Sequence, residues 1–211
     1  MPINPPRDCP ICPRLAAFVQ SHRPTHPDWH NAPVENFGDE NGRLLIVGLA
    51  PGLRGANRTG RPFTGDYAGD LLYQMLGEFG FARGAYGATP TDGLSLHDVQ
   101  ITNAVRCVPP GNKPVGAEIN ACRPFLTETI TAMPNLKVIL SLGRIAHDSL
   151  VRTLGQKPSA LPFGHNRVHQ SEQGLYLVSS YHCSRYNTNT GRLTEDMFRA
   201  VFVEITKLIQ R

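Results

Sequence analysis

Short apolar runs alternate with longer amphipathic stretches along this chain. The runs are rich in Leu, Ile and Val and too short for helices, so they predict buried strands at Leu44–Val47, Val99–Val105, Lys137–Leu142 and Leu175–Ser179. Apolar residues recur with helical spacing in Ala68–Phe79, Ala117–Ala132, Arg144–Leu154 and Glu195–Ile209. This alternation predicts an α/β fold with a parallel sheet covered on both faces.

The last helical segment has the clearest pattern. Thr194 precedes it as an N-cap, and its apolar residues share one face: Phe198, Val201, Phe202, Ile205, Leu208 and Ile209. The stretch from Ser21 to Asn41 is rich in His, Pro and Asn and reads as an irregular connection. With no repeat or low-complexity tract visible, we expect a single domain over residues 1–211.

Polar motifs follow three of the four predicted strands. The first strand runs into GLAPGLRGANRTGRPFTGD (Gly48–Asp66), the second into Asn103–Cys107, and the fourth into the polar stretch Tyr181–Arg192. In open parallel sheets, ligands bind outside the carboxyl ends of the strands. The three motifs are therefore expected to converge on one crevice.

Each conspicuous residue in these motifs has two interpretations. Phe63 is either core or a stacking platform, and its Gly, Pro and Thr neighbours favour the platform at least as much. Asn103 closes a turn or reads the edge of a base. His182 bonds locally at a strand end or donates into the crevice. Asp66 caps the following helix or orients a water molecule at the crevice mouth.

The five cysteines point to a metal site rather than a disulfide framework. Four of them are candidate ligands: Cys9 and Cys12 in a C-x-x-C pair, with Cys107 and Cys122. Structural zinc is commonly bound by two close pairs of ligands, whereas iron–sulfur clusters are bound by sets of cysteines with varied spacing. Spacing alone leaves a cluster, zinc and unrelated buried thiols open. Cys183 reads as a small buried hydrophobe.

Composition says little about the protein's partner or location. The 211 residues carry a formal net charge of +4, which suits an anionic partner without requiring one. The opening residues MPINPPRD lack an apolar segment, and no run approaches the roughly 20 residues of a membrane span. We therefore expect a cytoplasmic protein, in which thiols stay reduced.

Taken together, the motifs resemble the uracil-DNA glycosylase superfamily, specifically its iron–sulfur branch, family 5 or type B. The matching blocks are GLAPG with ANRTGRPFTGD, ITNAVRCVPPGNKP, and HCSRYNTNTGRLT, together with the C-x-x-C pair. They occur in the family's order from about Cys9 to Thr194. The resemblance implies a three-layer αβα fold with a four-stranded parallel sheet. It also implies a structural [4Fe–4S] cluster on Cys9, Cys12, Cys107 and Cys122.

The resemblance further implies a base-excision-repair enzyme that hydrolyses the N-glycosidic bond of flipped-out uracil and leaves an abasic site. Phe63 would stack on the base, Asn103 would read its edge, and His182 would hydrogen-bond the uracil O2 as negative charge develops there. The expected partner is double- or single-stranded DNA containing deaminated bases, bound by a monomer. The expected base-binding residues are Gly48, Leu49, Ala50, Phe63, Asn103 and His182. The expected DNA-binding residues are Arg54, Arg58, Arg61, Ser184, Arg185, Tyr186, Asn187 and Arg192.

Leu49 and Ala50 stand where other branches of the superfamily carry an acidic residue, so they cannot activate water. Family 5 shares this departure, which leaves Asp66 as the candidate base. Lys113 is the one lysine within the crevice motifs and lies at their outer edge, which disfavours a Schiff-base lyase. The apolar first motif also predicts tolerance of hypoxanthine and xanthine.

Three other functions compete with this interpretation. A non-catalytic binder of damaged or single-stranded DNA would explain Leu49 and Ala50 as marks of lost activity. An iron–sulfur electron-transfer or radical protein would use the cysteines differently. A nucleotide-phosphate enzyme has little support, because neither G-x-x-x-x-G-K-[ST] nor G-x-G-x-x-G follows the first strand.

Overall fold

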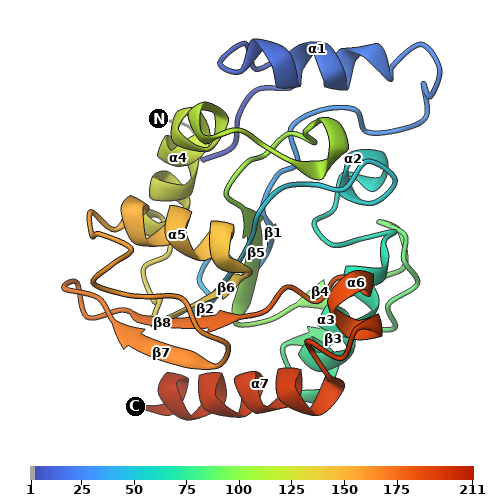
Figure 1. The fold of residues 1–211 in the computed structure, drawn as a ribbon. Helices are drawn as coiled ribbons and strands as arrows, with labels where there is room; N and C mark the ends of the chain where they lie inside the picture. Colours follow the sequence, from blue (N-terminus) through green and yellow to red (C-terminus); the bar gives the residue numbers. More distant parts are fainter. Residues whose placement is uncertain (1–2) are drawn as a thin grey trace.

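A computed structural model describes residues 3–211 and contains a central sheet between two layers of helices (Figure 1). Four parallel strands form the middle of the sheet and coincide with the four apolar runs. They are β2 (Leu44–Gly48), β5 (Val99–Asn103), β6 (Val138–Leu142) and β8 (Tyr176–Ser180). Their order is β5-β2-β6-β8. The predicted α/β class and parallel core are confirmed.

The sheet has six strands rather than the expected four. β1 (Phe37–Gly38) and β7 (Arg167–Gln170) add antiparallel edges beside β5 and β8. Neither carries an apolar run, because β1 has two residues and β7 has the sequence RVHQ, so periodicity could not reveal them. A separate hairpin pairs β3 (Ala82–Arg83) with β4 (Ser95–Leu96).

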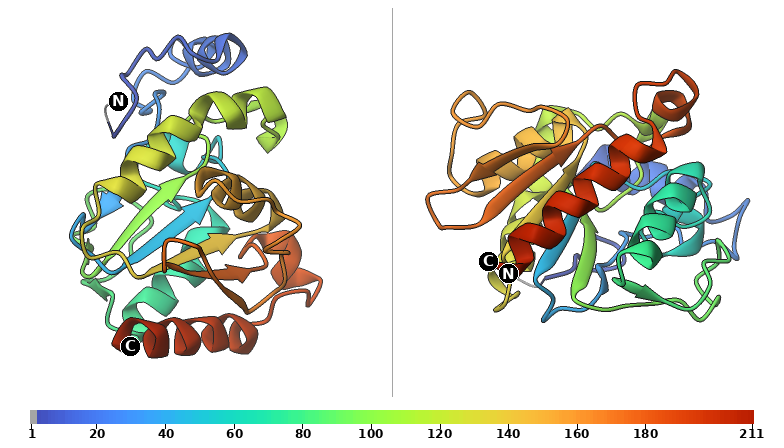
Figure 2. Two further views of the ribbon diagram at one scale, coloured as in Figure 1. Left: turned by 90° about the vertical axis from the view of Figure 1, so that its left-hand side faces the viewer. Right: turned by 90° about the horizontal axis from the view of Figure 1, so that it is seen from below.

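Helices cover both faces of the sheet, as Figure 2 shows. On one side α3 (Tyr67–Glu78) and α7 (Glu195–Gln210) pack over Leu44 and Ile46 of β2. On the other side α4 (Gly116–Thr131) and α5 (Arg144–Thr153) pack over Leu45 and Val47. The alternating residues of β2 thus enter opposite layers of the core, as a strand buried on both faces requires.

The four predicted helices are present, and three shorter ones join them. Thr194 caps α7, with its Oγ1 accepting a hydrogen bond from the Met197 amide at 3.2 Å. The additional helices are α1 (Pro13–Ser21), α2 (Ala56–Thr59) and α6 (Arg185–Asn189). In the part of the chain that is described, no helix is long and apolar enough to cross a membrane.

Candidate active site

A cavity of about 340 Å³ opens at the carboxyl ends of the parallel strands. Asn103, the last residue of β5, lines the cavity and pairs with Gly48 at the end of β2. His182, which follows β8, lines it as well. The three polar motifs therefore meet here, as the strand order predicts. The cavity is lined by Leu49, Ala50, Pro51, Gly52, Ala56, Phe63, Asp66, Tyr67, Ala68, Asn103, Asn112, His182, Ser184 and Arg185.

Phe63 forms one wall of the cavity. Its ring lies so close to Gly48 that a Cβ added there would be 2.7 Å from the ring's Cζ and would also clash with the Asn103 side chain. Phe63 has a backbone φ of 52°, a conformation that costs energy in a bulky residue and that clusters at functional sites. The glycine thus lets backbone, ring and amide approach one another closely.

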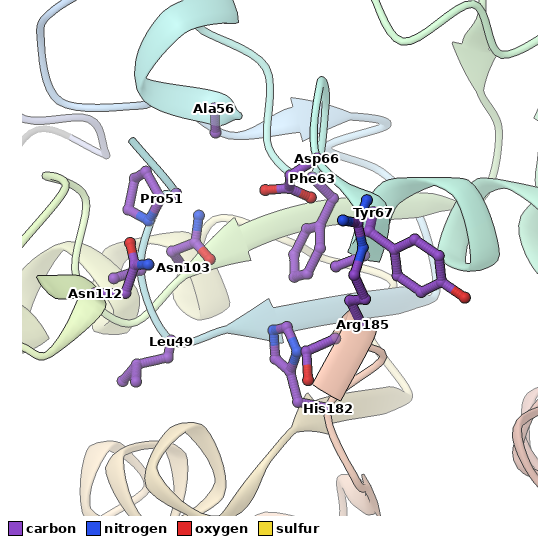
Figure 3. Close-up of a pocket in the computed structure, with 14 residues that line it drawn as sticks. Leu49, Pro51, Ala56, Phe63, Asp66, Tyr67, Asn103, Asn112, His182 and Arg185 are labelled. Atoms are coloured by element: carbon purple, nitrogen blue, oxygen red, sulfur yellow. The ribbon is translucent and has the colours of Figure 1, made fainter. Parts of the chain in front are cut away.

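Asn103 and His182 present unengaged polar atoms to this cavity (Figure 3). The Asn103 side chain is only 3% exposed. Neither its amide nor the imidazole nitrogens of His182 make a hydrogen bond to a residue in the range 3–211. The His182 ring lies 6.0 Å from the Phe63 ring, centroid to centroid, at an interplanar angle of 30°. Burial lowers the pKa of His182 to about 4, so the imidazole is neutral at physiological pH.

Asp66 occupies the N-cap position of α3 without making a side-chain cap hydrogen bond. The loop before it covers the carboxylate, since a Cβ on Gly52 would lie 3.0 Å from Asp66 Oδ2. Its Oδ1 is buried and has no hydrogen-bond partner among residues 3–211. Burial raises the pKa of Asp66, against the opposing effect of the Gly69 and Ala68 amides. A desolvated, incompletely satisfied carboxylate is suited to hold and deprotonate water.

Several cavity residues had not been predicted from the sequence. Tyr67 and Arg185 lie side by side at one side of the cavity, with the guanidinium carbon over the phenol ring, 5.2 Å from its centre (Figure 3). Asn112 approaches from the opposite side with a left-handed φ of 58°. A Gly-Asn pair inside PPGNKP is a recognisable turn signal, but it does not say where the turn points.

A family model described as the uracil DNA glycosylase superfamily matches residues 35–206. The chain is 44% identical over 206 residues to a type-5 uracil-DNA glycosylase of Thermus thermophilus, covering 95% of this chain and 93% of that protein. The chain belongs to the uracil-DNA glycosylase superfamily. The resemblance predicted from the motifs is confirmed, and with it the enzyme class, a DNA glycosylase.

Other relatives of this superfamily member span most of its length. A type-5 uracil-DNA glycosylase of Mycobacterium bovis is 39% identical over 208 residues, 95% of this chain and 78% of that protein. A type-4 uracil-DNA glycosylase of Sulfurisphaera tokodaii is 32% identical over 175 residues, 80% of this chain and 72% of that protein. The chain is thus more similar in sequence to these two type-5 enzymes than to this type-4 enzyme.

The four cysteines of the predicted cluster site lie together away from the glycosylase cavity. Cys9 and Cys12 precede α1, Cys107 follows β5, and Cys122 is in α4; all four line one small apolar cavity. Burial raises the pKa of Cys107 to about 12 and that of Cys122 to about 11, and the neighbouring thiols add to both shifts. Cys183 is fully buried in the main core, as predicted.

The spacing of these thiols bears on the kind of metal group. Within residues 3–211, no three His, Cys, Asp or Glu side chains are grouped closely enough to hold a metal ion. A tetrahedral zinc site needs every sulfur about 2.3 Å from one point. A cluster of several irons is ligated around its outside, so its cysteines stand farther apart. Four thiols around one cavity match in number and kind the Cys₄ ligand set of an iron–sulfur cluster.

Arg61 has a different role from the predicted DNA contact. Its side chain is 5% exposed and forms a two-pronged ion pair with Asp92, with Nη2–Oδ2 and Nη1–Oδ1 distances of 2.6 and 2.8 Å. The guanidinium also packs over Tyr73 and donates from Nε to the Thr64 hydroxyl. Every arm of the guanidinium is engaged inside the fold, so Arg61 supports the loop that carries Phe63. Arg54 and Arg58 remain exposed.

Breaking this ion pair should destabilise the protein strongly. We expect Asp92→Asn to lower the free energy of unfolding by about 3–5 kcal/mol, because it leaves a buried guanidinium without its anion. Thermal unfolding followed by circular dichroism would measure it. Glu204→Gln, which removes the partner of the exposed Lys207, is the control and should change the melting temperature little. Equal effects of the two substitutions would contradict the assignment.

The segment predicted as a polar loop after His182 contains the short helix α6. Ser184 caps it by accepting a hydrogen bond from the Asn187 amide, and the Asn187 side chain donates to the His182 carbonyl oxygen at 2.8 Å. Tyr186 is 72% exposed on this helix. Ser184 and Asn187 thus hold the segment's shape, while Tyr186 and Arg185 project outward.

A second hollow adjoins the first, sharing Leu49 and His182 with it. Two arginines line it, and each guanidinium lies over an aromatic ring: Arg144 over Phe163 at 5.2 Å and Arg192 over Tyr181 at 4.7 Å. Neither arginine pairs with a carboxylate in the described chain. Arg192 was predicted as a DNA contact from the sequence, whereas Arg144, at the start of α5, was not.

Proposed function

We propose that this glycosylase hydrolyses the N-glycosidic bond of uracil in DNA and leaves an abasic site. One observation carries the proposal: an unengaged amide and an unengaged neutral imidazole face an aromatic ring across a cavity at the sheet's carboxyl edge. These groups match a planar heterocycle with polar edges. The relatives described above are all uracil-DNA glycosylases, which supports the same substrate.

The reaction requires the base to leave the helix, which costs a few kcal/mol. Phe63 then stacks on the extruded uracil, and Asn103 supplies a donor and an acceptor to its Watson–Crick edge. The neutral His182 donates a hydrogen bond to O2, where negative charge grows as the glycosidic bond breaks. Because the neutral imidazole can donate this hydrogen bond, His182 does not have to be protonated at acid pH to stabilise the anion. The base departs as an anion held by His182.

Asp66 supplies the remaining chemistry in this proposal. Water must attack the sugar carbon once the base begins to leave, and neither Leu49 nor Ala50 can orient it. Asp66 lines the same cavity and keeps one carboxylate oxygen unpartnered. Its raised pKa makes it a better proton acceptor than an exposed aspartate, provided the pH keeps it ionised.

We also propose that the pocket accepts hypoxanthine and xanthine. Leu49, Ala50 and Ala56 line the cavity, and none of them carries a polar group that would reject a purine. Its volume lies at the lower end of the range of small-molecule sites, about 300–1,000 Å³, which is enough for a single base.

Exposed cations around the cavity fit a DNA backbone. Arg185 lines the base pocket, and Arg54 and Arg58 are exposed in the loop that carries Phe63. Arg144 and Arg192 line the second hollow. Tyr186, exposed on α6, would enter the space that the base vacates. Binding through these arginines would weaken as salt rises, because counterions are released from the DNA. We propose that the protein acts as a monomer.

Cys9, Cys12, Cys107 and Cys122 would hold a [4Fe–4S] cluster in this proposal. When bound, the cluster supplies a cross-link between the N-terminal segment, the turn after β5 and α4, with no part in base release. The ion pair between Arg14 and Glu118, with N–O distances of 2.7 Å, already joins α1 to α4 beside these cysteines. The ligand segments are thus brought together by the chain's own contacts.

Single-turnover assays on duplexes containing uracil, hypoxanthine or xanthine test the function. We expect release of free base and an abasic site that alkali cleaves, with no strand break before alkali is added. Binding without abasic sites would point instead to a non-catalytic DNA binder. Release of uracil alone would overturn the broad specificity and leave the glycosylase proposal standing.

Gly48→Ala should impair the enzyme by filling the pocket. The new methyl group would overlap the Asn103 side chain and the Phe63 ring, and displacements of about 1 Å at a reacting site can cost as much as 10²-fold. We expect kcat/KM for uracil release to fall tenfold to about 10²-fold. Gly77→Ala, in α3 with open space around the position, is the control and should leave kcat/KM unchanged. Wild-type kinetics in Gly48→Ala would contradict the pocket.

A further inference from the structure

Arg106 is a buried cation without an anionic partner. Its side chain is 1% exposed, between Val105 and Cys107 in the turn after β5. The guanidinium donates to neutral acceptors, the Thr129 hydroxyl at 2.9 Å and the Val34 carbonyl at 3.3 Å among them. Its Nε is buried with no hydrogen-bond partner, and no carboxylate forms an ion pair with it among residues 3–211.

Such an arrangement is costly unless an anion completes it. Neutral acceptors satisfy a guanidinium's hydrogen bonds in part, but they do not offset the loss of hydration of its charge. The chain treats its other deeply buried arginine differently, because Arg61 is paired with Asp92. Glu35 is the acidic side chain whose charge reaches Arg106, and it is exposed and not in contact. No carboxylate of residues 3–211 therefore supplies the compensating anion.

The cysteine cavity lies directly beside this cation. Arg106 itself lines the cavity, and its backbone amide donates to the Cys122 sulfur at 3.4 Å. When Cys122 is ionised, its charge lies near enough to the guanidinium to interact with it. Cysteines bind metal as thiolates, so the four of them would bring negative charge into this apolar region when they bind iron or zinc.

We propose that Arg106 is the buried counter-charge of the metal–thiolate group held by the four cysteines. This inference rests on the proposed ligand set of that site. The guanidinium stabilises the bound, net-negative group against loss of metal. It also stabilises the reduced cluster more than the oxidised one, because the reduced cluster carries one more negative charge. Arg14 does not fill this role, since Glu118 neutralises it.

Three variants of the holoprotein separate charge from hydrogen bonding. Arg106→Gln removes the charge and keeps polar hydrogen bonds, whereas Arg106→Lys keeps the charge and loses the forked donor. Thr129→Val removes a hydrogen-bond partner of Arg106 and leaves the charge in place. For each we would measure iron and zinc per chain, the rate of metal loss to a chelator, and the one-electron midpoint potential by film voltammetry.

We expect Arg106→Gln to shift the oxidised–reduced equilibrium at least tenfold toward the oxidised cluster, a lowering of the midpoint potential of about 59 mV. It should also lose metal faster, while Arg106→Lys and Thr129→Val keep the wild-type potential. An unchanged potential in folded Arg106→Gln would overturn the proposal and leave Arg106 a hydrogen-bonding hub. If Arg106→Gln does not fold, a tenfold shift in Arg106→Lys would overturn it instead.

The nature of the bound group is read from the wild-type protein in the same experiment. If it carries zinc, metal loss to the chelator replaces the potential as the readout, with the same expected order of variants. A wild-type chain that binds no metal would overturn both the counter-charge and the proposed cluster. Glycosylase activity, measured in parallel, reports on the proposed reaction separately from either result.

Discussion

Asp66→Asn should reduce the rate of uracil release by about 10²–10⁴-fold in single-turnover assays, the usual contribution of a positioned general base. The amide preserves the shape of the carboxylate but cannot accept a proton from water. Asn is also a favoured N-cap residue, so α3 should keep its start. A folded variant that releases uracil at the wild-type rate would reduce Asp66 to a structural role.

The pH profile separates these two roles further. Burial raises the pKa of Asp66, so wild-type activity should fall as pH drops through that raised value and the carboxylate becomes protonated. Asp66→Asn should lose this acid limb. The folded state binds the Asp66 proton more tightly than the unfolded chain does, so this group lowers stability as pH rises through the same window. Asp66→Asn should remove that loss of stability.

Asp70 provides a matched control in the same helix. It is exposed on the first turn of α3, and its charge contributes to the raised pKa of Asp66. Asp70→Asn should therefore keep the wild-type rate at neutral pH and move the acid limb slightly downward. A large fall in the rate of Asp70→Asn at neutral pH would contradict the assignment of Asp66, rather than Asp70, as the general base.

His182→Ala should lower the rate of uracil release by about 10²–10³-fold, the effect seen when one donor to a developing anion is removed. DNA binding should persist, because the exposed arginines proposed to contact DNA are untouched. His182→Gln retains an N–H donor and should recover part of the loss. His169→Ala, which alters a half-buried histidine on β7 away from the cavity, is the control and should behave as wild type.

The depressed pKa of His182, about 4, gives this prediction a second measurement. The wild-type rate should show no loss from imidazole protonation between pH 8 and pH 6. Unfolded histidine titrates near 6.5, so the unfolded chain gains its proton first, and stability should fall as pH drops from about 6.5 to about 4. His182→Ala should lack that fall. An activity that requires the protonated imidazole would contradict a neutral donor.

Sequence patterns located the site because the groups that form it follow buried strands. Gly48, Asn103 and His182 each lie at or just after the end of a recognisable apolar run, and parallel strands bring such ends together. Asp66 was found for a similar reason, as the last residue of the loop that the first strand opens. Local pattern and topology were sufficient for these positions.

The remaining features depend on contacts that no local pattern encodes. Arg61 looked like a phosphate contact because its partner, Asp92, lies 31 residues away in an irregular segment. Arg106 likewise showed no sign of burial, since a charged residue between two motif positions resembles a surface residue. Asn112 and Tyr67 line the cavity because of how the turns before and after them are folded. The polar edge strand β7 has no apolar run from which it could be predicted.

Strand β5 connects two places that have been described separately. Its last residue, Asn103, faces the glycosylase cavity, and the turn directly after it carries Cys107 to the cysteine cavity. A slip of one residue against β2 would turn Thr102 or Ala104 toward the base and displace Cys107 at the same time. The pairing register is therefore constrained from both ends. An insertion or deletion in this short stretch should be tolerated nowhere, although surface loops a few residues away could accept one.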